Sequence, residues 1–372
     1  MPPLVIDIRS AEDSRDVVHR AVQALAEGQL VALPTETVYG LAASALNEDA
    51  VARIVEVKNR GGKALALGIR SPDDVMDYLP DLTPLGRRLA RRCWPGPVTL
   101  VAEDCHPESL VRQLPRSVQE AVAPTGTIGL RVPAHPMVLD ILRMMMGPVV
   151  LTSANPKGGP DPVTADAVLD SLGDDVQMVL DDGPSRLGQP STVVKVGAKG
   201  LEVLRPGVVS AQTLTRLSSL MILLVCTGNT CRSPMAEVMC RKMIADRIGC
   251  TSDELGDHGV IVMSAGLSAM MGGRPSAEAV DVMARLGLNL ADHESQPLTT
   301  QLVRHADIIW TMTRSHRQAI ASHWPEALSR TFVLAQDQTD VSDPIGGPLT
   351  AYETCAEQIK GELERRVAEL DL

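Results

Sequence analysis

The sequence predicts an α/β fold in two parts of one chain. At 372 residues the chain is longer than a single hydrophobic core usually supports. In the C-terminal part, the short apolar run 221–225 has the pattern of a strand buried on both faces, and apolar residues at helical spacing follow the next loop. In the N-terminal part, segments with helical periodicity alternate with apolar runs that end in polar residues. Both parts therefore belong to the α/β class.

The boundary between the two parts is expected near residues 210–220. This stretch is polar and short, which is typical of a junction between domains. Met221 stands where a separate C-terminal protein would begin, which suggests a fusion. We therefore assign one domain to residues 1–212 and a second to residues 221–372.

The composition limits the classes of function. Hydrophobic residues make up 44% and charged residues 22%, but aromatic residues only 2%, so aliphatic side chains and 16 methionines must fill the cores. A net charge of −11 argues against a broad nucleic-acid surface. Seven cysteines without paired spacing suit a reducing compartment. No signal peptide and no stretch of transmembrane length is evident, so a cytoplasmic protein without membrane contact is expected.

The N-terminal elements follow from periodicity. Apolar residues on one face predict a helix over 11–27 that ends at Gly28, and residues 30–33 predict a buried strand. A second helix around 49–58 leads into a stretch, 58–63, with three cations and two glycines. Such a stretch suits a polyphosphate, although a solvated basic turn is the simpler interpretation of the stretch by itself. Further strands at 128–133 and 149–155 end in polar groups, as strands that carry ligand sites do.

The strongest chemical signal lies at residues 225–234. Cys226 and Arg232 are six positions apart, between the strand 221–225 and a helix whose first turn accommodates Pro234. Successive backbone N–H groups of such a loop form an anion site, and their positive field favours a thiolate nucleophile at Cys226. Arg232 can donate two hydrogen bonds to one phosphate. The alternative is a buried structural cysteine in a tight turn.

The chain ends in a helix with one apolar stripe. We expect this stripe to pack against a sheet as core, and its members are Tyr352, Cys355, Ile359, Leu363, Val367 and Leu370.

Residues 221–372 resemble the low-molecular-weight protein tyrosine phosphatases, and the loop resembles their bacterial arginine-phosphatase branch. The resemblance rests on the cysteine loop and on Asp343-Pro344. It implies a parallel sheet, a protein phosphatase acting on a phosphorylated protein through a phosphocysteine, and no metal or cofactor. Cys226 would be the nucleophile, Arg232 the phosphate ligand and Asp343 the general acid. The other implied phosphate-loop residues are Thr227, Gly228, Asn229, Thr230, Cys231 and Ser233.

Two positions bear on the substrate of this part. Thr230 resembles the arginine-phosphatase branch, where tyrosine-specific relatives commonly have a larger aliphatic residue. Ile345-Gly346 replaces the aromatic residues that stack on a phenyl ring in those relatives. We therefore expect phosphoarginine to be preferred over phosphotyrosine, unless Thr230 is a neutral size variant. A thiol arsenate reductase, which shares the loop, would need resolving cysteines on a mobile segment that this sequence does not provide.

Residues 1–209 resemble the YrdC/Sua5 family. The resemblance rests on the motifs at 34–41, 58–60, 94–100, 152–155, 191–194 and 205–207. It implies a twisted mixed sheet and synthesis of L-threonylcarbamoyladenylate from threonine, bicarbonate and ATP, with Mg²⁺ accompanying ATP, in a tRNA-modification pathway with possible partner proteins. The implied threonine site comprises Thr35, Tyr39 and Arg131. The implied ATP site comprises Lys58, Arg60, Ser153, Asn155, Ser191 and Arg205.

The N-terminal part departs from this family at the phosphate end of the implied site. Gly61-Gly62-Lys63 follows the cationic motif, and Pro190 and Lys195 stand where acidic residues are common. The alternative is therefore a non-catalytic module that binds nucleotide or RNA and regulates an active tyrosine phosphatase.

Overall fold

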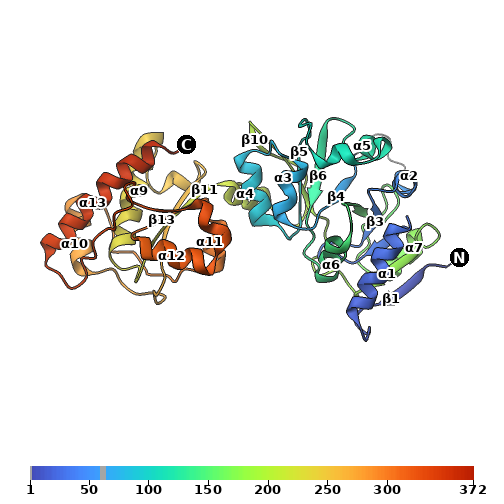
Figure 1. Ribbon diagram of the computed structural model, residues 1–372, viewed down its shortest axis with the longest axis horizontal. Coiled ribbons are helices and arrows are strands. Elements are labelled where there is room, and N and C mark those ends of the chain that lie inside the picture. Colours follow the sequence, from blue (N-terminus) through green and yellow to red (C-terminus); the bar gives the residue numbers. More distant parts are fainter. Residues whose placement is uncertain (1, 59–63) are drawn as a thin grey trace. The chain divides into compact units, whose positions relative to one another are not determined.

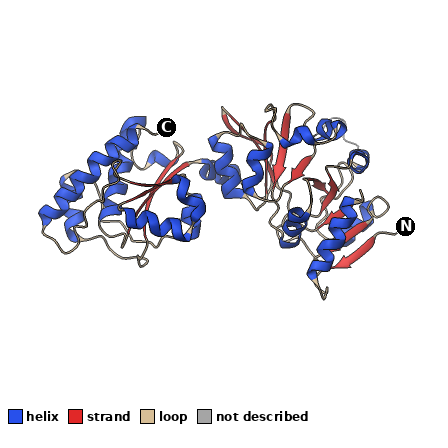
Figure 2. Cartoon of the chain, viewed as in Figure 1, coloured by secondary structure: helices blue, strands red, loops and turns tan. Residues whose placement is uncertain are grey.

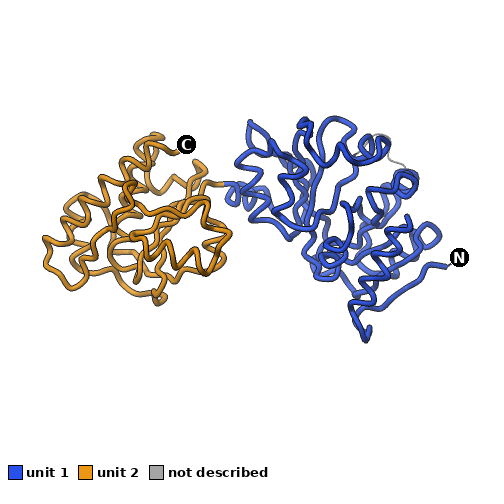
Figure 3. The backbone as a smooth tube through the Cα atoms, viewed as in Figure 1, with its two compact units in different colours: residues 1–218 blue, residues 219–372 orange. Residues whose placement is uncertain are grey.

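The computed structural model describes residues 2–58 and 64–372 and divides into two compact units, residues 1–218 and 219–372 (Figure 3). The expected polar junction at 210–220 is mostly helical (Figure 2): helix α8 spans Ala211–Ser218, and its Leu214 is buried. The Arg92 guanidinium of helix α4 donates a hydrogen bond to the Leu217 carbonyl at 2.6 Å. Helix α8 is thus part of the first unit, whereas residues 219 and 220 belong to the second.

Within the described part of unit 1, ten strands form one mixed sheet in the order β1-β8-β2-β3-β7-β4-β6-β5-β9-β10. Among them, Figure 1 labels β1, β3, β4, β5, β6 and β10. The strands are β1 (Leu4–Asp7), β2 (Val31–Leu33), β3 (Gly40–Ser44), β4 (Ala66–Gly68), β5 (Val98–Glu103), β6 (Thr127–Arg131), β7 (Val149–Ser153), β8 (Met178–Asp181), β9 (Thr192–Gly197) and β10 (Gly200–Arg205). The helices besides α8 are α1 (Ser14–Ala26), α2 (Glu48–Val57), α3 (Val75–Tyr78), α4 (Pro84–Cys93), α5 (Arg116–Val122), α6 (Pro136–Met144) and α7 (Ala165–Leu172).

Each of the first two helices begins after a capping residue, whose side chain accepts a hydrogen bond from a backbone N–H of the first turn. The Asp13 carboxylate accepts a hydrogen bond from the Arg15 N–H before α1, and the Asn47 side chain accepts one from the Ala50 N–H before α2. After α1, Gly28 adopts a positive φ of 82°, which favours glycine. Both helices predicted for this region are confirmed, with ends shifted by one to three residues.

Alternation along the strands of unit 1 gives the sheet two buried faces. On strand β2, Val31 and Leu33 point to one core, whereas Ala32 points to the other. Helices α1 and α6 cover the first face, and α2, α4, α5 and α7 contribute to the core on the second. The prediction of a mixed α/β sheet is therefore confirmed for this unit.

In unit 2, the described strands form a four-stranded parallel sheet in the order β12-β11-β13-β14. The strands are β11 (Leu220–Cys226), β12 (Val260–Gly266), β13 (Ile308–Thr311) and β14 (Thr331–Val333), and the helices are α9 (Arg232–Ile248), α10 (Ala277–Arg285), α11 (Thr300–His305), α12 (Arg314–His323) and α13 (Leu349–Ala368). The predicted parallel sheet is confirmed.

Strand β11 is buried on both faces, as its apolar sequence predicts. Ile222 and Leu224 pack in the core under α9, α10 and α13, while Leu223 and Val225 pack in the core with α11 and α12. All six residues of the predicted stripe near the C-terminus are buried, although Leu370 lies just beyond the end of α13. Along the described residues, no helix combines the length and apolar character that crossing a membrane requires.

Candidate active sites

The phosphate loop of unit 2 lies at the carboxyl end of β11. Cys226 is the last residue of β11 and Arg232 is the first residue of α9, so the predicted loop is slightly shorter than the sequence suggested. Strands β12 and β13 flank β11 on opposite sides, which places this end at the point where the chain's winding reverses. Such switch points are where open α/β sheets bind ligands.

The thiol of Cys226 is buried and directed by two hydrogen bonds. Its Sγ lies 2.9 Å from the Ser233 hydroxyl and accepts from the Asn229 N–H at 3.2 Å. Asn229 has a positive φ of 55°, an uncommon conformation for a side-chain-bearing residue. A donor hydroxyl and a donor amide next to Sγ stabilise a thiolate, which is the form that attacks phosphorus.

The buried Asn229 side chain holds the strained loop in place. Its Nδ2 donates to the hydroxyls of Ser233 at 3.0 Å and Ser264 at 2.8 Å, and its Oδ1 accepts from the Gln296 N–H at 2.9 Å. The Asn229 carbonyl contacts His293 Nε2 at 2.9 Å. Partners that lie 35 to 67 residues away along the chain carry no local signal, so the sequence did not identify them.

A glycine at the end of β12 makes room for the loop. A Cβ on Gly266 would lie 2.5 Å from the Thr227 carbonyl oxygen and 2.9 Å from the Asn229 nitrogen. Both atoms belong to the loop backbone and cannot rotate away. Gly266 is therefore required for the phosphate loop to approach β12, which gives the Ser264-Ala265-Gly266 strand end a structural role.

The Arg232 guanidinium reaches toward the second sequence motif. Arg232 is buried, and its Nη2 forms an ion pair with Asp343 Oδ2, while Nη1 donates to the Val341 carbonyl at 3.4 Å. The Asp343 side chain is 44% exposed. The structure thus brings Arg232 and Asp343 together beside the loop that begins at Cys226.

Thr230 lies in the second half of the loop. Its Oγ1 is 3.6 Å from Cys231 Sγ, and its carbonyl accepts a hydrogen bond from the Ser276 N–H at 3.0 Å. Cys231 is buried, with its Sγ 3.2 Å from the Ser276 hydroxyl and 3.9 Å from the Tyr352 hydroxyl. Cys231 therefore packs against α10 and α13, whereas Thr230 is partly exposed.

His316, in the first turn of α12, is a buried neighbour of the loop. Its Nε2 lies 2.9 Å from the Thr227 hydroxyl, and its Nδ1 is buried without a hydrogen-bond partner in the described part of the chain. Burial, and secondarily the charge of Arg232, lowers the pKa of His316 to about 4. The imidazole is therefore neutral at physiological pH and supports the loop as an uncharged group.

This depressed pKa predicts a pH-dependent stability of unit 2. Below its ordinary pKa of 6.5, the unfolded imidazole binds a proton that the folded one rejects until about pH 4. Stability is thus fully present above 6.5 and is lost progressively as the pH falls toward 4. We expect the melting temperature of the wild-type protein to fall more between about pH 7 and about pH 5 than that of His316→Gln, measured by circular dichroism. Equal decreases in the two proteins would contradict this account.

Unit 1 contains a cavity of about 180 Å³ beside the strand ends that the sequence singled out. The predicted site residues that line it are Thr35, Tyr39, Arg131, Ser153, Ser191 and Arg205. Gly40 on β3 pairs with Ser153 on β7, which joins two motifs that are more than a hundred residues apart. The structure therefore gathers both the expected threonine residues and expected ATP residues around one cleft.

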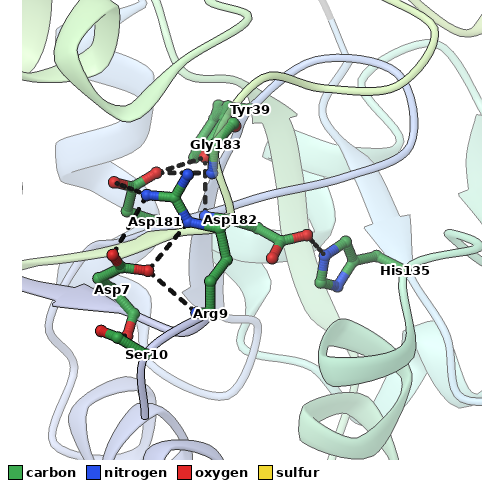
Figure 4. Close-up of polar contacts among 8 residues, drawn as sticks. All are labelled: Asp7, Arg9, Ser10, Tyr39, His135, Asp181, Asp182 and Gly183. Carbon is green, nitrogen blue, oxygen red and sulfur yellow. Dashed lines mark hydrogen bonds and ion pairs between the residues drawn. The ribbon is translucent and has the colours of Figure 1, made fainter.

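The hydroxyls on the threonine side are already engaged. Thr35 Oγ1 donates to the Val38 carbonyl at 2.6 Å. The Tyr39 ring is buried, and its hydroxyl donates to the Gly183 carbonyl at 2.8 Å and accepts from the Asp182 N–H at 3.1 Å (Figure 4). Burial raises the pKa of Tyr39 well above its ordinary value of 10.0. Tyr39 therefore presents its ring to the cleft and anchors the loop after β8 with its hydroxyl.

A buried ion pair that the sequence did not identify fixes Arg131. Its Nη2 contacts Glu36 Oε1 at 2.7 Å and donates to the Thr37 hydroxyl at 2.9 Å. Glu36 also accepts from the Ala134 N–H at 3.0 Å. Glu36, the acidic residue in the motif 34–41, was the sequence signal for this ion pair, because a buried carboxylate requires a cation nearby.

The opposite wall of the cleft is held by Arg205. Its Nη2 donates to the Ser191 carbonyl at 2.8 Å and to the Ser191 hydroxyl at 3.1 Å, and Ser191 in turn lies 3.1 Å from the Thr99 hydroxyl. Burial lowers the pKa of Arg205. Thr99 also lines the cleft and belongs to the motif 94–100, for which the sequence predicted no site residue.

Lys58 and Asn155 lie behind the cleft. The buried Lys58 ammonium donates to the Asn155 carbonyl at 2.6 Å, to Asn155 Oδ1 at 2.8 Å and to the Ser153 carbonyl at 2.9 Å. Lys58 therefore organises the turn 153–155, which carries a cleft residue. The expected ATP ligand Arg60, together with Gly61-Gly62-Lys63, lies outside the described residues.

Neither site has the donor set of a metal centre. Across residues 2–58 and 64–372, no three His, Cys, Asp or Glu side chains are grouped so that they would hold a metal ion. The polar side chains that line the cleft of unit 1 carry hydroxyls or, at Arg131 and Arg205, guanidinium groups. These groups suit the oxygens of phosphates and carboxylates. A Mg²⁺ ion in this cleft would therefore be held chiefly by the phosphates that accompany it.

Fold and sites together define a protein of two α/β units, one with a cysteine-based phosphate loop and the other with a polar cleft in a mixed sheet. The family model Sua5_yciO_yrdC, described as "Telomere recombination", matches residues 23–207. The model described as "Low molecular weight phosphotyrosine protein phosphatase" matches residues 221–371. The chain belongs to both families.

Individual relatives agree with this assignment. A putative threonylcarbamoyl-AMP synthase from Mycobacterium tuberculosis is 36% identical over 209 residues, which cover 55% of this chain and 89% of that protein. A protein-arginine-phosphatase from Bacillus subtilis is 38% identical over 151 residues, covering 40% of this chain and 93% of that protein. A structure of Sua5 from P. abyssi shares the fold at a TM-score of 0.51 and 24% identity, covering 71% of this chain and 91% of that one.

Both families consist of enzymes. The first comprises threonylcarbamoyl-AMP synthases, which act in tRNA modification and use ATP as a substrate, and the second comprises protein phosphatases. The chain thus combines a transferase domain with a hydrolase domain.

Proposed function

We propose that this is a bifunctional enzyme, with a cysteine-dependent protein phosphatase in residues 221–372 and an L-threonylcarbamoyladenylate synthase in residues 1–212. The observation that carries the phosphatase is the convergence of three groups: the buried Cys226 thiol, the Arg232 guanidinium and the Asp343 carboxylate paired with it. Their residue types match those needed to displace a phosphoryl group onto sulfur.

The proposed phosphatase reaction has two steps. The Cys226 thiolate attacks phosphorus, an S–P bond forms, and the bond to the leaving atom breaks while Asp343 donates a proton to that atom. Asp343 then accepts a proton from the water that attacks phosphocysteine, so that inorganic phosphate leaves and the thiolate returns. Arg232 and the loop N–H groups bind the phosphoryl oxygens in both steps.

We propose phosphoarginine in proteins as the preferred substrate. Thr230 is small, polar and partly exposed beside the loop, and Ile345, which is 68% exposed, offers no aromatic face. Loss of aromatic stacking weakens phenyl binding by roughly 0.5–1.5 kcal/mol per ring pair. A guanidinium leaving group needs less stacking, and Asp343 supplies both a proton and a charge partner. The deciding experiment compares phosphoarginine with phosphotyrosine hydrolysis by the full chain.

Thr230→Ile tests this preference. We expect the ratio of kcat/KM for phosphoarginine to that for phosphotyrosine to fall by about tenfold, because the larger apolar side chain displaces the hydroxyl from the mouth of the site. Thr251→Ile, at an exposed threonine outside the loop, is the matched control and leaves the ratio unchanged. If both activities of Thr230→Ile change in parallel, Thr230 does not determine the preference.

For unit 1 we propose that threonine and bicarbonate react with ATP in the described cleft, releasing pyrophosphate. Threonine would bind near Thr35, Tyr39 and Arg131, and ATP, as its magnesium complex, near Ser153, Ser191 and Arg205. Lys58 and Asn155 would support the ATP site, with Arg60 contributing a further cation. Partner proteins of tRNA modification would then receive the adenylate.

The second candidate for unit 1 is a nucleotide- or RNA-binding module without synthesis. It is favoured by one feature of the chain, the replacement of expected acidic residues by Pro190, which lines the cleft, and by Lys195 on β9. Pyrophosphate release by the full chain that requires ATP, threonine and bicarbonate together supports the synthase. ATP binding without any pyrophosphate release supports the module instead.

A further inference from the structure

A second cavity of unit 1 lies between helices α1 and α6 and has a volume of about 620 Å³. It shares no lining residue with the synthase cleft. Figure 1 shows α1 and α6 close together on one side of the sheet, and the two helices pack through a common core. A concave site of this size is in the usual range for small organic ligands.

The floor of this cavity is apolar. Val18 of α1 and Met137 of α6 line it and also join the core between the helices. Met144, near the end of α6, is 48% exposed and also lines the cavity. Methionine side chains adapt to ligands of varied shape. The floor therefore suits a flexible hydrocarbon or a ring.

The rim of the cavity contains two exposed side chains of α1 that can donate hydrogen bonds to an anion. Both acidic residues that line it are paired: Asp140 with Arg143 at 3.1 Å, and Asp182 with His135 at 3.1 Å. Among residues 2–58 and 64–372, no hydrogen bond or ion pair engages the side chains of Arg15 or His19, both exposed on α1. Arg15 supplies a positive charge without an ionic partner among the described residues, and His19 supplies a hydrogen-bond donor, so this part of the rim suits an anion.

One end of the cavity adjoins the residues that hold Tyr39. His135, Pro136 and Asp182 also line a smaller cavity of about 220 Å³, which reaches Thr35 and Glu36. The Nδ1 atom of His135 is buried and lacks a partner among the described residues, while its Nε2 faces Asp182 (Figure 4). The Asp182 N–H donates to the Tyr39 hydroxyl. His135 and Asp182 thus connect this cavity with the threonine side of the cleft.

We propose that the cavity between α1 and α6 binds an amphipathic anion, namely a carboxylate or phosphate that carries an apolar group. The anionic end pairs with Arg15 and His19, and the apolar end covers Val18, Met137 and Met144. Through His135 and Asp182, occupancy of this cavity alters threonine affinity, and that second step rests on the proposed synthase site.

The binding step is tested with octanoate as the probe, by its displacement of anilinonaphthalene sulfonate from the full-length protein. Octanoate should compete, while octanol and octylamine, which have the same chain but no anionic end, should not. Arg15→Glu should weaken octanoate by about tenfold, as expected when a charge-assisted hydrogen bond is lost. Arg20→Glu places the same charge change on α1 outside the cavity and should bind octanoate normally. Equal competition by octanol, or normal octanoate binding by Arg15→Glu, would overturn the proposal.

The second step is tested by binding alone. Octanoate affinity is measured with and without saturating threonine, and threonine affinity with and without octanoate. Each pair of values should differ by about fivefold or more, and by the same factor, because coupling between two sites is reciprocal. Two independent affinities would refute the connection through His135 and Asp182. If threonine does not bind at all, the proposed synthase site fails, and the octanoate competition still decides whether the cavity binds an anion.

Discussion

Replacing Cys226 with serine is expected to abolish phosphatase turnover while leaving unit 2 folded. The Cys226 Sγ is buried against the Ser233 hydroxyl and the Asn229 N–H, a setting that a serine hydroxyl fits in size. A hydroxyl stays protonated there, so the nucleophile is lost although the phosphate loop remains. The loss is measured as release of phosphate from phosphoarginine or an aryl phosphate. Turnover at the wild-type rate by the serine variant would disprove the assignment of the nucleophile.

A second variant of unit 2 tests Asp343 as the general acid. Asp343→Asn removes the proton donor and keeps the side chain's shape, so kcat should fall by on the order of 10²–10⁴. Asp340, three residues earlier and paired with Arg314, offers a matched control outside the phosphate loop. Asp340→Asn should retain most of the activity. Comparable losses in the two variants would show that the effect arises from the acidic segment as a whole.

The sequence was sufficient to predict groups that are close together along the chain. Cys226 and Arg232 are six residues apart, and the apolar strand before them and the helix after them determine their geometry, so both were predicted with the correct neighbours. The stripe on the last helix was likewise predicted because helical spacing is local. In both cases the residues lie on one helix, or on one loop between a strand and a helix, so local sequence determines their relative positions.

Long-range contacts were not accessible to the same reasoning. The environment of Asn229 depends on Ser264 of strand β12 and on His293 and Gln296, which lie in the segment between α10 and α11. Residue periodicity identifies which residues are buried, but it does not state which strand ends meet. The motifs 34–41 and 152–155 were recognised separately, and their meeting across β3 and β7 required the antiparallel register of the sheet.

At Lys58 the contacts in the structure differ from the role that the sequence motif suggested. The sequence suggested a cation that faces phosphate, whereas the structure binds the ammonium to the turn that follows β7. Three oxygens in one turn leave little of the ammonium for a ligand. Lys58 is therefore better described as the residue that shapes the turn 153–155 at the wall of the cleft, and this interpretation changes what its replacement should do.

Lys58→Met should lower pyrophosphate release by about tenfold or more and weaken ATP binding with it. The methionine fills the space of the lysine stem but leaves the buried Asn155 carbonyl without the ammonium donor, while the Ser153 carbonyl and the Asn155 amide oxygen each keep one other donor. An unsatisfied buried carbonyl costs about 1–3 kcal/mol, enough to rearrange the turn 153–155. Ser153 lines the cleft, so its displacement reaches the bound nucleotide.

Two controls separate this local effect from general unfolding. Lys199→Met, at an exposed lysine in the turn between β9 and β10, should release pyrophosphate at the wild-type rate. Phosphatase turnover of Lys58→Met should also be normal, because unit 2 has its own core. Pyrophosphate release is followed together with the ATP affinity, so the comparison is informative even if unit 1 binds nucleotide without synthesis. Wild-type ATP affinity and wild-type turnover in Lys58→Met would show that the turn 153–155 keeps its shape without the ammonium.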